Sequence, residues 1–449
     1  MDYSNKISEL AAKAYDYYNI PANTYTSLNL KRGLRNQDGT GVLAGLTRIC
    51  EVHGYVMSED EKTPIPGQLS YRGYDINDLT ANPGIDHRFG FEEIAYLLIF
   101  GNLPTNDELI SFCECLAELR ELPDYFAEDM IIKAPSRNVM NKMARSVLAL
   151  YSYDDNPDST DIENVMRQSL LLLARMPILA VYGYDAKVHH YDRKSLIMHN
   201  PKPGLSTAEN LLRMLSRNKE FTPLEAEVLD TALMLHAEHG GGNNSTFSCR
   251  VLSSTGTDTY SAIASAVCSL KGPKHGGANA QVIGMMDDLQ QNVENWSDDA
   301  QIYDYLLKVV RKEAYDKSGL IYGLGHAVYT LSDPRAVLLK AKAKQLCEEK
   351  GQLELFKLYE SVERLGPKAF AEVKKVDRAM CANVDLYSGL IYRMLNIPQE
   401  MFTPIFAIAR TAGWCAHRME ELISGGKIIR PAYKTVIKRG QQYVDINDR

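Results

Sequence analysis

Hydrophobic residues recur along most of this chain with the three- and four-residue spacing of amphipathic helices. Residues 91–100 show this pattern and are followed by Gly101, which is typical of a helix end. Thr105, with Glu108 three residues later, has the signature of a capping box. The pattern therefore predicts two consecutive helices with a short connection between them.

A long apolar segment predicts a helix over residues 161–182, with a break at Pro177 because proline lacks the N–H that an inner helical turn needs. Thr222 followed by Pro223 predicts the start of another helix, which runs through Leu235. The same spacing predicts further helices over residues 259–271, 276–291, 300–317, 333–349, 386–396 and 402–423.

Signals for β-strands are weak and confined to two places, residues 47–53 and the C-terminal tail. Strands and helices do not alternate, and the chain contains no internal repeat or low-complexity tract. We therefore predict a mainly α fold. The length of 449 residues is enough for two or three domains.

The charge balance bears on possible partners. The chain has 50 Lys and Arg against 57 Asp and Glu, a formal net charge of −7. A broad basic surface, which binding to nucleic acid or an anionic membrane requires, is therefore not expected. Local binding of small anions remains compatible with this charge, because a few buried arginines can reverse the potential of a pocket.

The N-terminal residues, the longest apolar stretch and the cysteines together predict a cytoplasmic protein. The first ten residues are polar and acidic, unlike a signal or transit peptide. The apolar stretch 170–184 is interrupted by Arg175 and Pro177 and is too short to span a bilayer. The eight cysteines form no Cys-x-x-Cys pair, so we expect reduced thiols and no zinc ribbon.

Four segments place titratable side chains beside glycines at predicted helix ends. They are residues 235–247, 271–279, 322–335 and 382–389. Taken singly, each has an ordinary structural explanation. His236 and His239 have the spacing of a metal-binding pair but lack a third ligand nearby. The Gly323-x-Gly325 pair lacks the third glycine and the strand of a dinucleotide loop, and Asp385 alone is compatible with a helix N-cap.

Taken together, the four segments resemble the signature blocks of the citrate synthase family in order and spacing. The matching sequences are His236-Ala-Glu-His239, Lys271-Gly-Pro-Lys-His-Gly-Gly-Ala-Asn279, Gly323-Leu-Gly-His-Ala-Val328 with Asp333-Pro-Arg335, and Asn383-Val-Asp-Leu-Tyr-Ser-Gly389. Residues 66–74 and 91–104 resemble two earlier family segments. The resemblance covers roughly residues 40 to 435 and implies an acyltransferase of the tricarboxylic acid cycle.

The resemblance implies three catalytic residues: Asp385 as the base that deprotonates acetyl-CoA, His275 as the donor to the thioester oxygen, and His326 as the donor to the ketone of oxaloacetate. The local sequence agrees with the role of His275. It precedes Gly276 and Gly277, where a helix is predicted to begin, and the helix dipole there disfavours an imidazolium ion.

The resemblance also implies that His239, Arg335, Arg410 and Arg430 bind oxaloacetate. Arginine suits this role because its planar fork pairs with carboxylates. Arg430 is implied to reach the site of the partner subunit, which makes the protein a homodimer. Neither a metal nor a cofactor is implied, because the CoA thioester is itself a substrate.

The implied architecture has two helical domains and a mobile cleft. Residues 1–276 and 386–449 form the large domain, and residues 277–385 form the small one. Its closure is expected to exclude water during the condensation.

The contacts with CoA follow the family less closely. Ala327 and Thr330 stand where many bacterial members have basic residues. The predicted CoA contacts are instead Gly323 and Gly325, whose backbone can approach the adenine, and Lys274, whose charge attracts the CoA anion.

Three alternatives remain open from the sequence. The first is a 2-methylcitrate synthase that uses propionyl-CoA, since one methylene changes specificity by only about 1–3 kcal/mol. The second is a metal-dependent hydrolase at His236 and His239. The third is a helical binding protein without catalytic activity.

Overall fold

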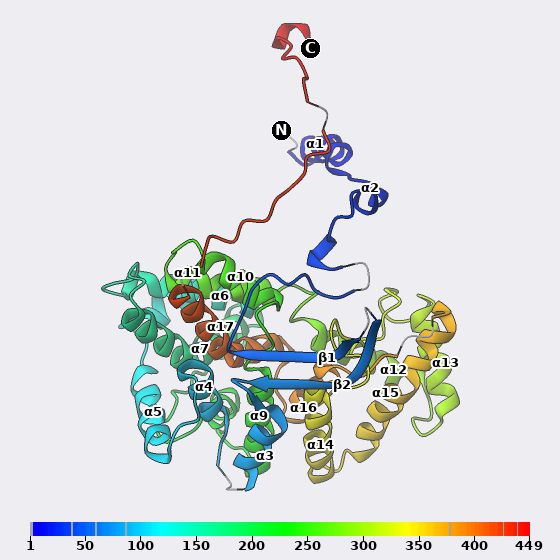
Figure 1. Ribbon diagram of the computed structural model, residues 1–449. Helices are drawn as coiled ribbons and strands as arrows, with labels where there is room; N and C mark the ends of the chain where they lie inside the picture. The colour runs from blue at the N-terminus through cyan, green and yellow to red at the C-terminus, as the bar shows by residue number, and fades with distance from the viewer. Residues whose placement is uncertain are drawn as a thin grey trace.

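The computed structural model of the protein describes residues 3–36, 39–58, 61–85, 88–376, 379–424, 426–437 and 439–449. It is mainly α, as the periodicity predicts, with a small antiparallel sheet laid across one face (Figure 1). The helices of the first part of the chain are α1 Tyr3–Tyr18, α2 Ala22–Ser27, α3 Ile76–Ile85, α4 Phe91–Phe100, α5 Asn106–Leu119, α6 Val139–Leu150, α7 Ile162–Tyr191, α8 Thr207–Leu215, α9 Pro223–His236, α10 Asn244–Ser253 and α11 Thr259–Leu270.

The remaining long helices are α12 Ala278–Asn292, α13 Asp299–Val310, α14 Pro334–Glu349, α15 Leu353–Lys374, α16 Val384–Met394 and α17 Phe402–Ile423. Helices α12 to α15 gather on one side of the body, and α4 to α7 lie on the other (Figure 1). Helix α16 packs against α9, α12, α14 and α15, so it lies between the two groups. The first residues of α16 are therefore well placed to bring the two sides together.

The described N-terminal helices and the C-terminal tail project from the same side of the body (Figure 1). Both carry exposed apolar side chains, among them Leu10 at 57%, Tyr433 at 96% and Tyr443 at 85% of their full exposure. Large apolar side chains at such exposure are typical of surfaces that bind another protein chain.

Several predicted helix ends agree with the structure. Helix α4 ends at Gly101, whose φ of +93° is the left-handed conformation that glycine adopts without strain. Thr105 and Glu108 form the predicted capping box at the start of α5. Thr222 caps α9, with Pro223 as its first residue.

The predicted break at Pro177 is wrong, because α7 continues through that residue to Tyr191. Pro177 is buried, and α7 packs against both α6 and α17. Burial of apolar surface along both neighbours offsets the one hydrogen bond that proline cannot donate. Helix α7 is also long and apolar enough to cross a bilayer, but 72% of its apolar window is buried, as in the core helix of a folded domain.

The predicted helix 300–317 ends earlier, at Val310, because the chain then turns through Lys312, Tyr315 and Lys317, which all have positive φ. Helices α1, α2, α3, α6, α8, α10 and α15 were not predicted. Helix α15 contains Pro367, and proline usually marks a helix end. The strand predicted in the C-terminal tail is wrong: the described residues of the tail form no strand.

The sheet comprises β1 Cys50–Ser58, β2 Glu61–Tyr71 and β3 Tyr74–Asp75, in that order and antiparallel. The predicted strand over residues 47–53 thus corresponds to the start of β1. Its register with β2 shifts next to Gly54. A Cβ atom at Gly54 would lie 2.8 Å from the carbonyl oxygen of Val328, and one at Gly67 would lie 2.2 Å from that of Ser332. The two glycines therefore let the sheet approach the segment 328–332 closely.

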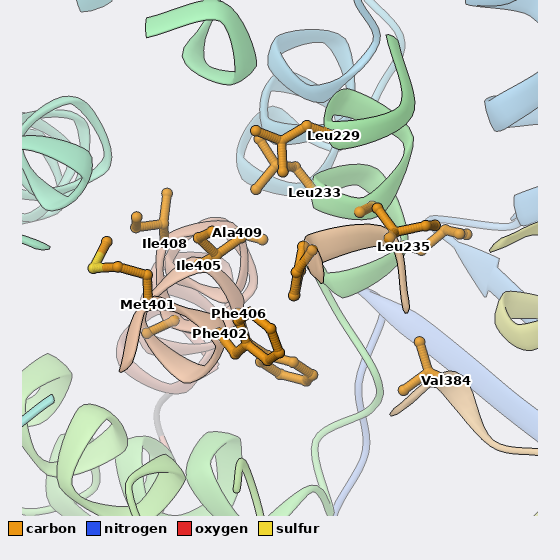
Figure 2. Packing of buried hydrophobic residues seen from close by; sticks show 14 of the residues in the cluster. Leu229, Leu233, Leu235, Val384, Met401, Phe402, Ile405, Phe406, Ile408 and Ala409 are labelled. Carbon is orange, nitrogen blue, oxygen red and sulfur yellow. The ribbon is translucent and has the colours of Figure 1, made fainter. Parts of the chain in front are cut away.

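The interior between α9 and α17 is apolar. Figure 2 shows the side chains of Leu229 and Leu233 on α9 together with those of Ile405 and Ala409 on α17. All four are fully buried. At about 25 cal/mol per Å² of buried apolar surface, such contacts give α17 a fixed position on α9. The polar residues of both helices are thereby held in register.

Candidate active site

The end of α9 and the segment after Gly325 meet at two histidines that are far apart in sequence. The rings of His239 and His326 lie edge to face, with centroids 5.1 Å apart. Tyr329 stacks on His326 at 4.7 Å and meets His239 edge-on at 5.6 Å. The structure thus brings together two of the histidines that the sequence predicts for the site.

The backbone fixes the protonation state of His326. The N–H groups of Val328 and Tyr329 both donate to Nδ1 of the ring, each at 3.1 Å. Nδ1 therefore carries a lone pair and the proton lies on Nε2. Burial, reinforced by the charge of Arg335, lowers the pKa of His326 to about 4. At neutral pH this ring is an uncharged donor through Nε2.

Asp385 lies in the first turn of α16, where Asn383 caps the helix by accepting from the Asp385 N–H at 3.0 Å. Burial raises the pKa of the Asp385 carboxyl to about 7, against the opposing effect of Arg335. A carboxyl group with this pKa is partly ionised at neutral pH and is a stronger base than an ordinary aspartate.

The glycine turn before His326 is joined to the segment before Asp385. Gly323 and Gly325 both have φ of +86°, a conformation that a side chain would strain. The Gly325 N–H donates to the carbonyl of Cys381 at 2.8 Å, and the Asn383 N–H donates to that of Gly323 at 2.9 Å. The Asn383 side chain also donates to the Gly325 carbonyl. His326 and Asp385 are therefore carried on one hydrogen-bonded piece of backbone.

His275 precedes α12, as predicted, and its tautomer is also fixed. The Ser245 N–H approaches Nε2 at 3.3 Å, and the Ser245 hydroxyl lies 3.2 Å from the same atom. A backbone N–H only donates, so Nε2 accepts and the proton lies on Nδ1. Burial, together with the charge of Arg410, lowers the pKa of His275 to about 4. Trp414 supports this arrangement by donating from Nε1 to the Ser245 hydroxyl at 3.2 Å.

The two predicted arginines within the body are both buried but differ in their partners. Arg335 donates to both oxygens of Asp333, at 3.0 and 2.7 Å. Burial opposes the charge of Arg335, yet the interaction with Asp333 raises its pKa above the ordinary value. Arg410 donates only from Nε, to the carbonyl of His236 at 2.6 Å.

The two terminal nitrogens of Arg410 are buried and have no hydrogen-bond partner in the described part of the chain. Burial lowers the pKa of Arg410, but an arginine remains charged at neutral pH. His239 is similar, since its Nε2 is buried without a partner and burial lowers its pKa far below the ordinary value. These groups provide donors for a small dianion such as a dicarboxylate.

Two predicted residues lie outside this cluster. Lys274 is exposed beside His275, and Arg430 is exposed in the C-terminal tail, where the neighbouring Ile429 N–H donates to Ser254. Arg430 is therefore not brought to the cleft of its own chain.

His236 and His239, the possible metal-binding pair, do not point toward a common site. His236 packs on Phe406 with centroids 4.3 Å apart, whereas His239 faces His326 and Tyr329. Within the described residues, no group of three His, Cys, Asp or Glu side chains has the geometry of a metal site. This arrangement gives the metal-hydrolase alternative no support.

The structure adds supporting residues that the sequence reading missed. They are Ser245 and Trp414 beside His275, Tyr329 beside His326, Asp333 beside Arg335, and Asn383 before Asp385. Asp333 and Asn383 lie inside the signature blocks, so the sequence could have identified them. The sequence could not have identified Trp414, because its contact with Ser245 depends on how α17 packs.

Comparison with known proteins agrees with this geometry. Residues 35–432 match the family described as citrate synthase, C-terminal domain. The chain belongs to the citrate synthase family. Members of this family transfer acyl groups, so the protein is an enzyme of that class.

The relatives match over nearly their whole length. A citrate synthase of Synechocystis is 35% identical over 409 residues, covering 91% of this chain and 92% of the relative. One of Haloferax volcanii is 33% identical, covering 94% and 99%. A 2-methylcitrate synthase of Shewanella oneidensis is 31% identical, covering 85% and 92%.

A solved structure is similar as well. It is the citrate synthase of Thermoplasma acidophilum in a ternary complex with carboxymethyl coenzyme A and oxaloacetate. The TM-score is 0.75 at 26% identity, and the match covers 94% of this chain and 99% of that one. The mainly α fold is therefore that of the citrate synthase family.

Proposed function

We propose that this enzyme condenses acetyl-CoA with oxaloacetate and hydrolyses the resulting citryl-CoA to citrate and CoA. The observation that carries the proposal is the pair of fixed tautomers, which makes His275 a neutral donor through Nδ1 and His326 one through Nε2. Two neutral donors and a carboxylate base suit a reaction that polarises a thioester and a ketone in succession.

In the first step, Asp385 removes a proton from the methyl group of acetyl-CoA. His275 donates from Nδ1 to the thioester oxygen, where negative charge develops. The Asp385 pKa of about 7 is high for a carboxyl group, which favours proton abstraction from a weak carbon acid.

In the second step, the enol carbon attacks the ketone carbon of oxaloacetate and forms a carbon–carbon bond. His326 donates from Nε2 to the ketone oxygen. Arg335, Arg410 and His239 hold the carboxylates, together with Arg430 of the partner subunit. Water then cleaves the thioester, which releases citrate and CoA.

The two terminal nitrogens of Arg410 support the assignment of oxaloacetate. Charge-assisted hydrogen bonds contribute about 1.5–3 kcal/mol each, and a carboxylate satisfies both nitrogens at once. Arg335 already donates to both oxygens of Asp333. Arg335 therefore contributes to substrate binding largely through its positive charge.

We also propose the domain division given above, with residues 277–385 as the part that closes over the cleft. The gathering of α12 to α15 on one side of the body supports it (Figure 1). The exposed apolar residues of both termini support a homodimer in which each tail covers the partner. We propose that the enzyme is cytoplasmic and needs neither metal nor cofactor. Gly323, Gly325 and Lys274 remain the proposed contacts with CoA.

A second candidate function is 2-methylcitrate synthesis from propionyl-CoA and oxaloacetate. The similarity to a 2-methylcitrate synthase favours considering it, and the same residues serve both reactions. The ratio of kcat/KM for the two thioesters separates the candidates. A ratio in favour of propionyl-CoA would overturn the choice of acetyl-CoA.

The test of the proposed function is release of free thiol from each acyl-CoA, with and without oxaloacetate. We expect release from acetyl-CoA only when oxaloacetate is present, and its loss in Asp385→Ala. Unchanged release in that variant would contradict the mechanism, and no release by the natural enzyme would favour a binding protein. Activity that disappears with a strong chelator would revive the metal-dependent alternative.

A further inference from the structure

Glu238 is a buried carboxyl group to which the mechanism assigns no role. In sequence it lies between His236 and His239, and its side chain is fully buried. One oxygen, Oε1, accepts from the Gly240 N–H at 2.6 Å and lies 3.2 Å from Nε2 of His417. The other oxygen, Oε2, has no hydrogen-bond partner among the described residues. Burying a carboxylate oxygen without a hydrogen-bond partner costs free energy, which suggests that Glu238 has a function.

Helix α17 is shaped to receive this carboxylate. Arg410, Gly413 and His417 follow one another at three- and four-residue spacing, so they lie on one face of the helix. A Cβ atom at Gly413 would lie 2.0 Å from Oε2 of Glu238. The carboxylate therefore rests on bare backbone, with Arg410 one turn before it and His417 one turn after it.

A hydrogen-bonded chain keeps Glu238 ionised. Nδ1 of His417 lies 2.9 Å from a guanidinium nitrogen of Arg250, which only donates. The His417 proton is therefore on Nε2 and is donated to Glu238. Burial by itself raises the pKa of Glu238, but His417 and the charge of Arg410 outweigh it and hold that pKa below the ordinary value.

The outer end of this chain is neutralised separately. Arg250 pairs with Glu420 and with Glu421, each at 2.8 Å. These two carboxylates more than balance the single positive charge of Arg250, so that charge is not available to Glu238. Glu238 is left as the negative charge that faces Arg410.

Glu238 and Arg410 influence each other without direct contact. Each lies within the electrostatic range of the other, yet no ion pair joins them in the described part of the chain. The terminal nitrogens of Arg410 consequently stay available to a substrate carboxylate. Its charge is partly balanced before any substrate arrives.

We propose that Glu238 is a counter-charge and positioning residue of the oxaloacetate pocket. Its carboxylate balances Arg410 in the free enzyme, holds the turn after His239 through the Gly240 N–H, and limits how tightly the pocket holds oxaloacetate and citrate. This inference rests on the proposed function. Citrate carries more negative charge than oxaloacetate, so the counter-charge weakens product binding more than substrate binding.

The direct test is Glu238→Gln, which keeps the shape of the side chain and removes its charge. We expect the KM for oxaloacetate and the inhibition constant of citrate to fall about three- to tenfold, with the larger change for citrate. The KM for acetyl-CoA should change by less than about twofold, because its donor is His275 and not Arg410. Glu238→Asp keeps the charge and should restore values near those of the natural enzyme.

Glu421→Gln is the matched control. It removes a buried carboxylate that forms an ion pair with Arg250, the residue that follows His417 in the chain of contacts leading away from Glu238. A fall in both constants for Glu421→Gln as large as that for Glu238→Gln would contradict the proposal, because it would make the effect one of overall charge.

An unchanged or raised KM for oxaloacetate in a folded Glu238→Gln enzyme would also overturn the proposal and leave Glu238 a structural residue. If the glutamine variant does not fold, Glu238→Asp and Glu238→Asn give the same comparison of charge at constant shape. Failure of the proposed function is distinguishable, since the natural enzyme would then release no thiol.

Discussion

The backbone N–H of Ser245 points at Nε2 of His275 across 3.3 Å, and this contact decides which nitrogen of the imidazole carries its proton. The Ser245 hydroxyl adds a second contact to the same nitrogen and accepts from Trp414. The orientation of His275, the proposed donor to the thioester, is thus set by residues on α10 and α17.

Ser245→Ala should lower kcat about tenfold while leaving the KM for oxaloacetate nearly unchanged. The substitution leaves the buried Nε1–H of Trp414 without an acceptor, at a cost of about 1–3 kcal/mol, and loosens the His275 ring. Steady-state kinetics with each substrate varied measure the effect. Ser248→Ala, on an exposed face of the same helix, is the control and should behave like the natural enzyme. A larger change in the KM for oxaloacetate than in kcat would contradict this role.

Arg410→Gln should lower kcat/KM for oxaloacetate about 10²- to 10⁴-fold, because two charge-assisted hydrogen bonds to a carboxylate are lost. The free variant should also be less stable than the natural enzyme, because the buried Glu238 loses the positive charge that balances it. Kinetics and thermal unfolding without ligands measure the two effects. Arg364→Gln, which breaks a half-exposed pair with Asp299, should leave kcat/KM unchanged. An Arg410→Gln enzyme that binds oxaloacetate normally would refute the assignment.

The pH dependence of kcat/KM for acetyl-CoA should show an acid limb with an apparent pKa near 7. Asp385 must be ionised to act as a base, and burial raises its pKa to about 7. Below that pH the rate should fall tenfold per pH unit. His275 and His326 have pKa values of about 4 and stay neutral donors throughout this range. A limb near pH 4 instead would show that the pKa of Asp385 is not raised in the folded enzyme.

Asp385→Asn should abolish activity and stabilise the folded enzyme at high pH. The folded pKa lies above the ordinary value of 3.8, so ionisation of Asp385 destabilises the fold above pH 7, and this cost vanishes below about pH 4. We expect the melting temperature of the variant to exceed that of the natural enzyme by about 2–4 °C at pH 8. The two should melt together at pH 4. A stabilisation that is equal at both pH values would point to packing rather than charge.

Gly67→Ala should lower kcat at least about tenfold and reduce stability by about 1–3 kcal/mol. The added Cβ would lie 2.2 Å from the Ser332 carbonyl oxygen and 2.6 Å from the Tyr329 ring, which stacks on His326. Kinetics and denaturant unfolding measure the two changes. Gly204→Ala is the control, because a Cβ there meets no atom within 4 Å. Unchanged kcat in a destabilised Gly67→Ala enzyme would show that the packing of the sheet on Tyr329 does not influence His326.

The sequence predicted the helices whose ends carry strong local signals, such as Gly101 and the pair Thr105 and Glu108. It failed at Pro177, because burial of α7 against two helices outweighs the local preference of proline. It placed His239, His275, His326 and Asp385 by resemblance, and the structure brings His239 and His326 into contact. The support from Trp414 and the role of Gly413 depend on how α17 packs against α9 and α10, which no local pattern encodes.

The hydrogen bonds between Asn383 and the turn of Gly323 and Gly325 have a consequence for the evolution of this enzyme. Because His326 and Asp385, the proposed ketone donor and carbon base, are carried on one hydrogen-bonded backbone unit, a change that loosens either end displaces both. Paired substitutions in these two segments should therefore show strong epistasis, with second changes costing far less than first ones. Adaptive paths toward other substrates are then expected to leave this unit intact and to begin at residues that touch neither segment.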